Sequence, residues 1–163
     1  METTAELESA PPSGVYRRDA SDATSALRFG ETYPGGGRAE FEALSRLYAA
    51  DPEHVARPID LNTDSDGNVV GYDMEFIEGP NLFEYLQEHG FLPEGASAQI
   101  RDALKVFHAS GVVHGDVNPK NIILTTNGTI KFVDPVGFGK IKPDDLKRYI
   151  DADMEAASRL IGS

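Results

Sequence analysis

Apolar residues alternate with polar ones in the first half of the chain and recur at helical spacing in the second half. In the first half, alternation between polar turns predicts four strands, over residues 14–18, 24–29, 56–61 and 68–77. Between the second and third strands, residues 38–50 place Phe41, Leu44 and Tyr48 on one stripe, as in an amphipathic helix. We therefore expect the first half to form a small sheet with one helix.

The second half is expected to form helices around one short hairpin. Helical spacing and glycine stop signals predict helices over residues 81–90, 96–110 and 144–161. Two short apolar runs, residues 121–124 and 129–133, flank a Thr-Asn-Gly turn. Strands followed by helices predict an α+β fold with two lobes, residues 1–79 and residues 80–163.

Composition narrows the choice of partners. The 163 residues carry 27 acidic and 15 basic side chains, and the net charge of −12 disfavours binding to nucleic acid or anionic lipid. The absence of cysteine excludes disulfides and thiolate chemistry. No apolar run approaches the ~18 residues of a membrane span, and no basic leader precedes one, so we expect a cytoplasmic protein. The oligomeric state stays open.

Lysine is scarce in this acidic chain. The basic residues are nine Arg and six Lys, and the first lysine is Lys105. Acid excess with few lysines is compatible with a protein adapted to high salt and with an ordinary acidic protein, and composition does not decide between the two.

A dense polar loop lies between two β-branched segments at residues 112–123, VVHGDVNPKNII. Burying its polar side chains would cost desolvation, so we expect the loop to face a cleft. Asp116 offers a carboxylate, and Asn121 offers an amide oxygen where the next strand starts. A carboxylate that accepts a hydroxyl proton and an amide oxygen that binds a hard cation are groups that phosphoryl transfer requires.

Asp134 extends this set at the end of the following strand, thirteen residues after Asn121. A carboxylate beside an amide oxygen at the mouth of one hairpin predicts a Mg²⁺ site. Taken singly, Asn121 could be a turn former and Asp134 could merely end a strand. The common register of Asp116, Asn121 and Asp134 with the predicted hairpin favours a site.

These residues resemble the motifs of the protein-kinase-like superfamily, H-x-D-x-x-x-x-N and D-F-G. The resemblance implies a two-lobed kinase fold with a small β-rich N-lobe and a reduced, mainly helical C-lobe. It also implies ATP and Mg²⁺ as cofactors, catalytic roles for His114 and Asp116, and metal ligation by Asn121 and Asp134. Gly115, and Pro135-Val136-Gly137 after Asp134, are more similar to the atypical, RIO-like and aminoglycoside- or choline-phosphotransferase branches.

The first lobe resembles the nucleotide-binding lobe of that family. Arg28 stands where the family has its phosphate-binding lysine, and Glu40 is the candidate partner for it. Replacing lysine by arginine is not conservative at a phosphate clamp, because the guanidinium is longer, planar and forked. Alternatively, Arg28 lies outside the site, or Glu40 is a solvated surface acid.

The adenine contacts and the phosphate loop are inferred from the same resemblance. Val15 would lie over the adenine, and the hinge backbone from Phe76 to Glu78 would hydrogen-bond it. The stretch LESAPPSGVYR, residues 7–17, falls in register with the family's glycine-rich loop, yet the three glycine positions hold Glu8, Ala10 and Ser13. Without these glycines, backbone amides would approach phosphate less closely there. A plain disordered leader is the alternative assignment for this stretch.

The function predicted from these residues is ATP-dependent transfer of a phosphoryl group to a hydroxyl, with a protein serine or threonine preferred as acceptor. Lys120 would neutralise the transferring group, although Asn118 holds the place of the usual family lysine. One alternative is a pseudokinase that binds nucleotide or acts as a scaffold. Another is a small-molecule phosphotransferase.

Three further signals receive simpler interpretations. Residues 62–73, NTDSDGNVVGYD, nearly match a calcium loop, but the predicted strands on both sides favour a hairpin turn. His108 is interpreted as partly buried packing. Asp153, on the last helix, is interpreted as a surface acid, and the alternative implied by the resemblance is an anchor for the catalytic-loop backbone.

Overall fold

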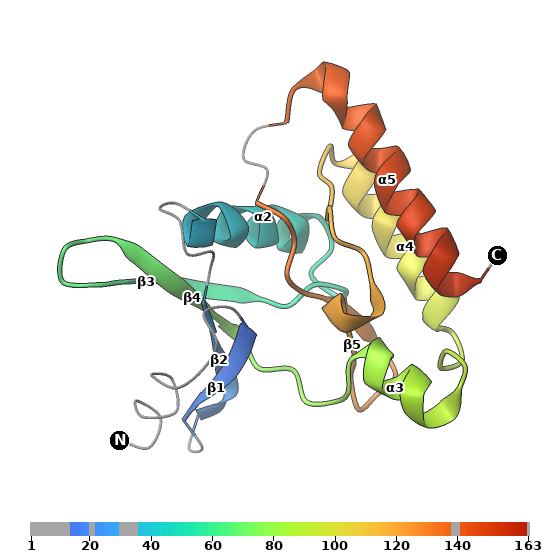
Figure 1. The fold of residues 1–163 in the computed structure, drawn as a ribbon, viewed down its shortest axis with the longest axis horizontal. Helices are drawn as coiled ribbons and strands as arrows, with labels where there is room; N and C mark the ends of the chain where they lie inside the picture. Colours follow the sequence, from blue (N-terminus) through green and yellow to red (C-terminus); the bar gives the residue numbers. More distant parts are fainter. Residues whose placement is uncertain (1–13, 20–21, 30–35, 138–140, 163) are drawn as a thin grey trace.

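The computed structural model describes residues 14–19, 22–29, 36–137 and 141–162, and four of its strands form one antiparallel sheet (Figure 1). In spatial order the sheet is β1-β2-β4-β3, made of β1 (Gly14–Asp19), β2 (Asp22–Phe29), β4 (Val69–Glu75) and β3 (Pro58–Thr63). Each observed strand overlaps its prediction to within about two residues, as expected for element ends. The pairing of the two central strands, β2 and β4, matters for the candidate site, because it places Arg28 of β2 opposite Tyr72 of β4.

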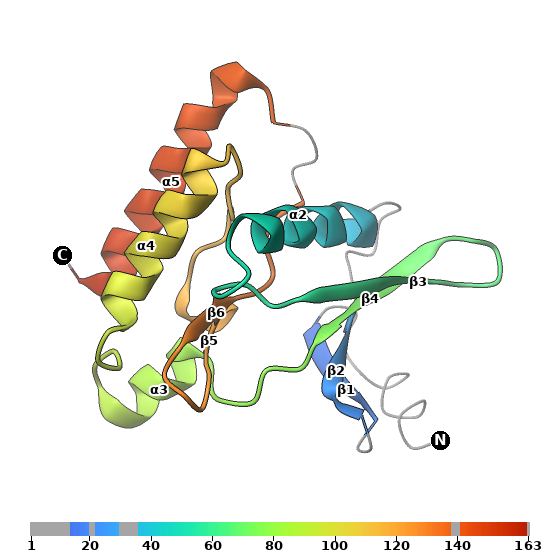
Figure 2. The same cartoon turned by 180° about the vertical axis from the view of Figure 1, so that it is seen from behind.

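Helix α2 (Gly36–Ala50) lies beside this sheet, packed against β3 and β4 (Figures 1 and 2). Its predicted apolar stripe is confirmed, since Leu44 is buried in the core and Phe41 and Tyr48 are partly buried against it. Glu40 lies one turn before Leu44 and is buried with it, with 6 % of its surface exposed. A helix that buries one face brings this carboxylate inside together with Leu44.

The β3–β4 hairpin extends beyond the rest of the molecule in both views (Figures 1 and 2). In its turn, Oδ1 of Asp64 accepts hydrogen bonds of 2.9 Å from the backbone amides of Asp66 and Asn68. These amides, that of Asn68 first, lower the pKa of Asp64, and Gly67 adopts φ 85°. The predicted hairpin turn is confirmed, because strands and not helices flank the calcium-like sequence.

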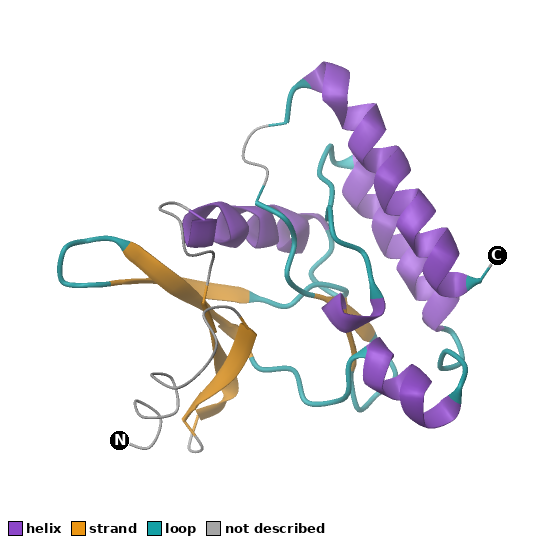
Figure 3. Cartoon of the chain, in the orientation of Figure 1, coloured by secondary structure: helices purple, strands orange, loops and turns teal. Residues whose placement is uncertain are grey.

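Helices α3 (Leu82–His89), α4 (Ala96–Ala109) and α5 (Pro143–Ile161) fill the second half, separated from the strand-rich half in Figure 3. A capping box starts α3, because Asn81 accepts from the Glu84 amide and the Glu84 carboxylate accepts from the Asn81 amide. Helices α4 and α5 lie side by side (Figures 1 and 2). Within the described residues, no helix is both long enough and apolar enough to span a bilayer.

The short hairpin of β5 (Ile122–Leu124) and β6 (Ile130–Phe132) lies between the helices and the first half (Figure 2). On one side, Gln99 of α4 donates to Gly128 O and accepts from the Ile130 amide, both at 2.9 Å. On the other side, the Phe132 amide donates to His54 O at 2.8 Å. The hairpin therefore joins the helical half to the segment that follows α2.

Gly79 fits a tight space where the chain passes from the sheet to the helices. Its φ is 140°, and a Cβ atom there would lie 2.0 Å from Leu124 O of β5. Only glycine combines this backbone conformation with so close an approach. The passage between the two halves is thus held against the hairpin by backbone packing.

Candidate active site

The catalytic-loop sequence starts with a buried histidine whose backbone is held from α5. The amides of His114 and Gly115 donate to Oδ2 and Oδ1 of Asp153, each at 2.9 Å. Both oxygens of one carboxylate are thereby fixed to consecutive amides, and Gly115 adopts φ 91°. One acid of the last helix therefore sets the direction in which the loop leaves its buried start.

The prediction that Asp153 is a surface acid was wrong, because only 2 % of the residue is exposed. His108 of α4 adds a third hydrogen bond, 2.9 Å from Nε2 to Oδ2, and is itself partly buried as predicted. Burial alone would raise the pKa of Asp153, but the hydrogen bonds from His108 and the two amides outweigh it and lower the pKa. Spacing gave a signal for this burial, since Asp153 shares a helix face with Ile150 and Ala157.

The His114 ring ties the loop to the strand that precedes Asp134. Nε2 lies 2.7 Å from Val133 O, and Nδ1 accepts from the Asp116 amide at 3.1 Å. This pattern places the ring proton on Nε2. Burial lowers the pKa of His114 and so favours the neutral ring. His114 thus fixes backbone positions on both sides of the site.

The Asp116 side chain is exposed and held by two amide side chains. Its Oδ1 accepts from Nδ2 of Asn118, and its Oδ2 accepts from Nδ2 of Asn121, both at 3.0 Å. Pro119 begins the short 3-10 helix η1 (Pro119–Asn121), which brings Asn121 back to Asp116 five residues later. Each carboxylate oxygen has more than one lone pair, so hydrogen-bonding capacity remains for a further donor.

The backbones of Asn121 and of the residue before Asp134 are joined at the mouth of the β5–β6 hairpin. The Val133 amide donates to Asn121 O at 2.9 Å, so Asp134 is the next residue along from this cross-strand bond. Asp134 adopts φ 57°, a left-handed conformation that is uncommon outside glycine and frequent at functional sites. An amide oxygen and a carboxylate oxygen are hard ligands, so this pair fits a magnesium ion in chemistry and position.

Glu40 reaches the same region from the sheet half. Its Oε1 accepts from the Tyr72 hydroxyl at 3.2 Å, so the alternative of a solvated surface acid was wrong. The backbone of Arg28 pairs with Tyr72 on one side and with Val15 on the other. The predicted side-chain contacts of Arg28 and Val15 lie outside the described part of the chain, as do the positions of Glu8, Ala10 and Ser13.

Gly137, the last residue of the motif that starts at Asp134, makes a close approach that the sequence did not predict. A Cβ atom at this position would lie 2.7 Å from Ala39 C and 2.8 Å from the Glu40 nitrogen. The segment after Asp134 therefore runs against the start of α2, and its path brings Asp134 and Glu40 to one region. Only the absence of a side chain at 137 permits this approach.

The remaining predicted residues lie at the edges of this region. Phe76 is partly buried and Glu78 is exposed, and both follow β4 directly, where a hinge was expected. The Lys120 ammonium lies over the Phe83 ring of α3, 4.9 Å from its centroid. This contact holds Lys120 at the exposed end of the loop, and its role in transfer stays a prediction.

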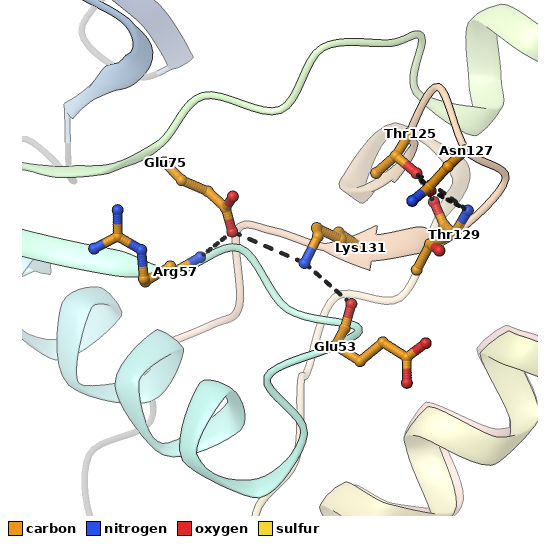
Figure 4. Close-up of polar contacts among 7 residues, drawn as sticks. All are labelled: Glu53, Arg57, Glu75, Thr125, Asn127, Thr129 and Lys131. Carbon is orange, nitrogen blue, oxygen red and sulfur yellow. Dashed lines mark hydrogen bonds and ion pairs between the residues drawn. The ribbon is translucent and has the colours of Figure 1, made fainter.

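A second polar cluster, which the sequence did not predict, lies at the end of β4, just before the hinge (Figure 4). It consists of Lys131, Glu53, Glu75 and Arg57, and we call it the Lys131 brace. The ammonium of Lys131 lies 3.1 Å from Glu53 O and 3.9 Å from Oε1 of Glu75. The same Glu75 oxygen accepts from the Arg57 amide at 2.8 Å. The Lys131 brace therefore links β6 to the end of β4, immediately before Phe76.

Comparisons with known proteins agree with this geometry. The family model described as "Protein kinase domain" matches residues 38–147. Serine/threonine-protein kinase PkaA of Streptomyces coelicolor is 43 % identical over 113 residues, which cover 67 % of this chain and 18 % of PkaA. A probable cAMP-dependent protein kinase catalytic subunit of Encephalitozoon cuniculi is 34 % identical over 111 residues, covering 66 % of this chain and 33 % of the relative.

A solved structure gives the same fold. The crystal structure of Rad53 1-466 in complex with AMP-PNP superposes with a TM-score of 0.62 at 22 % identity, covering 85 % of this chain and 39 % of that chain. The chain thus spans about a third or less of the length of these two curated relatives. The predicted α+β kinase-like fold is confirmed.

Proposed function

Because the chain belongs to the protein kinase family, we propose that it transfers the γ-phosphoryl group of ATP to a hydroxyl, with a serine or threonine of a protein as acceptor. One observation carries the proposal. Asn121 donates to the Asp116 carboxylate, and its own backbone oxygen is bound by the amide next to Asp134. Asp116, Asn121 and the backbone next to Asp134 are thereby linked at one hairpin mouth, which suits a reaction that depends on positioning and charge.

Asp116 is the group proposed to act on the acceptor. Its carboxylate is exposed, oriented by Asn118 and Asn121, and able to accept the proton of an incoming hydroxyl. His114 acts as a positioning residue, because its buried ring touches the loop and Val133 rather than solvent. Lys120 is proposed to approach the transferring group by leaving the Phe83 ring, a small cost for an exposed cation–π pair.

Asn121 and Asp134 would hold magnesium, which when bound neutralises phosphate charge and aligns the triphosphate. The hydrogen bond from the Val133 amide, next to Asp134, to the backbone oxygen of Asn121 fixes the backbone at this pair before any ion arrives. The oxygen ligands of Asn121 and Asp134 fit a magnesium ion in chemistry. Among the described residues, no group of three His, Cys, Asp or Glu side chains is suited to bind a metal. Asn121 is not one of those four residue types, so its amide oxygen would add a hard ligand to the carboxylate of Asp134.

The nucleotide would lie between the sheet and the hairpin. Glu40, buried beside Tyr72, would hold Arg28 on the phosphates, while Val15 and the backbone of Phe76 to Glu78 would contact the adenine. The complex of Rad53 with AMP-PNP supports a nucleotide in the shared fold. We place the division between the lobes after Gly79, so that residues 1–79 close over residues 80–163.

Labelled ATP tests this function. The purified protein is incubated with γ-labelled ATP and Mg²⁺, alone and with a mixture of proteins, beside Asp116→Asn and Asp134→Asn. Asp66→Asn, at the exposed hairpin turn, is the matched control. We expect label on protein with the wild type and the control, and a loss of at least about a hundredfold in both site variants.

Other outcomes separate the alternatives. Transfer that survives both site substitutions would contradict the proposal. Magnesium-dependent ATP binding without transfer would favour a pseudokinase, an interpretation that Arg28 in place of lysine also favours. Label that moves only to small hydroxyl compounds in an extract would indicate a small-molecule phosphotransferase.

A further inference from the structure

A pocket of about 570 Å³ opens between the catalytic loop and α5, outside the nucleotide site described above. One wall is the loop from Gly115 to Pro119, including Asp116. The other wall is one face of α5, formed by Ala152, Ala156, Arg159 and Leu160. These four recur at spacings of four, three and one, which places them on a single stripe of the helix.

The pocket and the proposed base share a residue, and this decides what the pocket can do. A group bound between the loop and α5 lies next to Asp116, because this exposed residue is part of the lining. The side chains of Ala152 and Ala156 are small and extend little into the pocket, so an extended chain has room to approach the loop. The pocket therefore has a place for an acceptor hydroxyl at the base, with chain continuing along the helix.

Arg159 sets the chemistry at the far end of this stripe. Its guanidinium is mostly exposed and lies 3.0 Å from Oε1 of Glu155, which does not line the pocket. Exposed pairs of this kind on one helix contribute little, so a carboxylate of a bound chain can replace Glu155. A forked guanidinium binds a carboxylate with two parallel hydrogen bonds, which an exposed amine cannot do.

We propose that the acceptor is a protein segment bound in this pocket, with its serine or threonine hydroxyl at Asp116 and an acidic side chain at Arg159. This inference rests on the proposed function and adds to it the place where the acceptor segment binds and an acidic residue that flanks the acceptor. In the step it serves, the acceptor oxygen forms a bond to the γ-phosphorus of ATP while the bond from that phosphorus to the β–γ bridging oxygen breaks. The hydroxyl proton passes to Asp116, and ADP leaves.

The negative net charge of the chain opposes binding of an acidic acceptor segment only at long range. A net charge of −12 repels acidic peptides in dilute buffer. At physiological salt, charges separated by more than about 8 Å are largely screened, whereas a carboxylate in contact with Arg159 is not. The local guanidinium is therefore expected to decide selectivity at about 0.15 M salt.

Peptide binding tests the pocket without requiring transfer. Three fluorescent peptides share one central serine and carry aspartate, asparagine or lysine at the flanking positions. Anisotropy is measured with the wild type, Arg159→Glu, Ala152→Phe and Ser158→Phe, at about 0.15 M salt and with Mg²⁺ and AMP-PNP present. Ser158 is exposed on α5 and does not line the pocket, so its variant is a matched control for added bulk.

We expect the wild type to bind the aspartate peptide more tightly than the lysine peptide, and Arg159→Glu to reverse this order by about fivefold. Ala152→Phe should weaken all three peptides by about tenfold or more, because the phenyl ring fills the space beside the loop, whereas Ser158→Phe should bind as the wild type does. Thermal melting of each variant separates lost binding from lost folding, and Arg159→Glu gives a result even if Ala152→Phe unfolds.

The outcomes for the pocket and for the transfer reaction are distinct. Equal binding of the three peptides by the wild type, or unchanged order in Arg159→Glu, would overturn the pocket proposal. Label transfer to mixed proteins in that case would leave the kinase function standing. The expected binding pattern without any transfer from labelled ATP would support the pocket as a peptide site and overturn the transfer reaction.

Discussion

Two polar networks join distant parts of this chain, and they differ in how deeply they are buried. The anchor of the catalytic loop joins His108, His114 and Gly115 to Asp153, whose carboxylate is buried. The Lys131 brace joins Glu53 and Glu75 through an ammonium that keeps 19 % of its side-chain surface exposed (Figure 4). Both networks hold a loop near the site, but water can replace the partners of only the second.

This difference in burial predicts which of the two networks costs more free energy to disturb. A buried carboxylate with three donors is costly to disturb, because whatever replaces it leaves buried N–H groups without an acceptor. A partly exposed ammonium that loses its partners can be solvated by water at a smaller cost. The catalytic loop is therefore expected to stay rigid under conditions in which the back of the hinge can adjust.

The largest effect is expected from breaking the buried anchor. Asp153→Asn should lower the free energy of unfolding by about 3 kcal/mol, since one carbonyl oxygen cannot serve two amides and a histidine. Urea denaturation followed by circular dichroism measures the change. Asp151→Asn, an exposed acid of the same helix paired with Lys147, should change the same quantity by about 0.5 kcal/mol or less.

A loss below about 1 kcal/mol in Asp153→Asn, or equal losses in the two variants, would mean that the anchor contributes no more than a surface pair.

The next effect concerns backbone packing at the hinge rather than charge. Gly79→Ala should lower the free energy of unfolding by about 2 kcal/mol or more. The φ of 140° is unfavourable for alanine, and the added Cβ atom would lie 2.0 Å from the Leu124 backbone oxygen. Gly90→Ala is the matched control, since Gly90 has φ 80° but open space around its Cβ position. It should cost about 1 kcal/mol. Equal costs would contradict the close approach to β5.

A smaller effect is expected from pH. Burial lowers the pKa of His114 below its ordinary value of 6.5, so the unfolded chain binds a proton more readily than the folded chain. The stabilisation is fully present above pH 6.5 and is lost as pH falls below 6.5 toward the folded pKa. The free energy of unfolding should thus decrease by up to about 1.4 kcal/mol per pH unit in that range.

Histidine variants assign this pH dependence. Unfolding free energies at pH 7.5, 6.5 and 5.5 should show a shallower decline in His114→Asn than in the wild type. His89→Asn, which replaces an exposed histidine of α3, should retain the wild-type decline. The same slope in all three proteins would show that His114 does not bind a proton differently on folding.

The smallest effect is expected at the Lys131 brace. Lys131→Met should lower the free energy of unfolding by about 0.5–1 kcal/mol, because it removes a hydrogen bond and a weak ion pair but keeps the aliphatic stem. Lys147→Met, at a pair whose two side chains are mostly exposed, should change it by less. A loss as large as that of Asp153→Asn would contradict the contrast between the two networks.

The sequence predicted the elements and the hairpin mouth because both depend on local patterns. Helical spacing located α2, α4 and α5, and the fixed separations of Asp116, Asn121 and Asp134 are matched by one hairpin whose register brings the three segments together. Turn chemistry was equally informative at residues 62–73, where Asp64 and Gly67 form the hairpin turn.

What the sequence did not predict depends on packing between distant segments. Asp153 was interpreted as a surface acid because charged residues are usually exposed, although its spacing with Ile150 and Ala157 placed it on the apolar face. The close approaches at Gly137 and Gly79 could not be predicted, because the atoms that exclude a side chain belong to Ala39 and Leu124, far away in sequence. Interactions of this kind follow from tertiary structure alone.

A double-mutant cycle on nucleotide binding tests most directly whether Asn121 and Asp134 act as one metal site. ATP affinity is measured by calorimetry with and without Mg²⁺ for the wild type, Asn121→Ala, Asp134→Asn and the double variant. If both residues hold the same ion, each single change should remove most of the gain in affinity that magnesium gives, and the double variant should lose little more. Independent, additive losses, or a magnesium gain that survives both changes, would contradict a shared site.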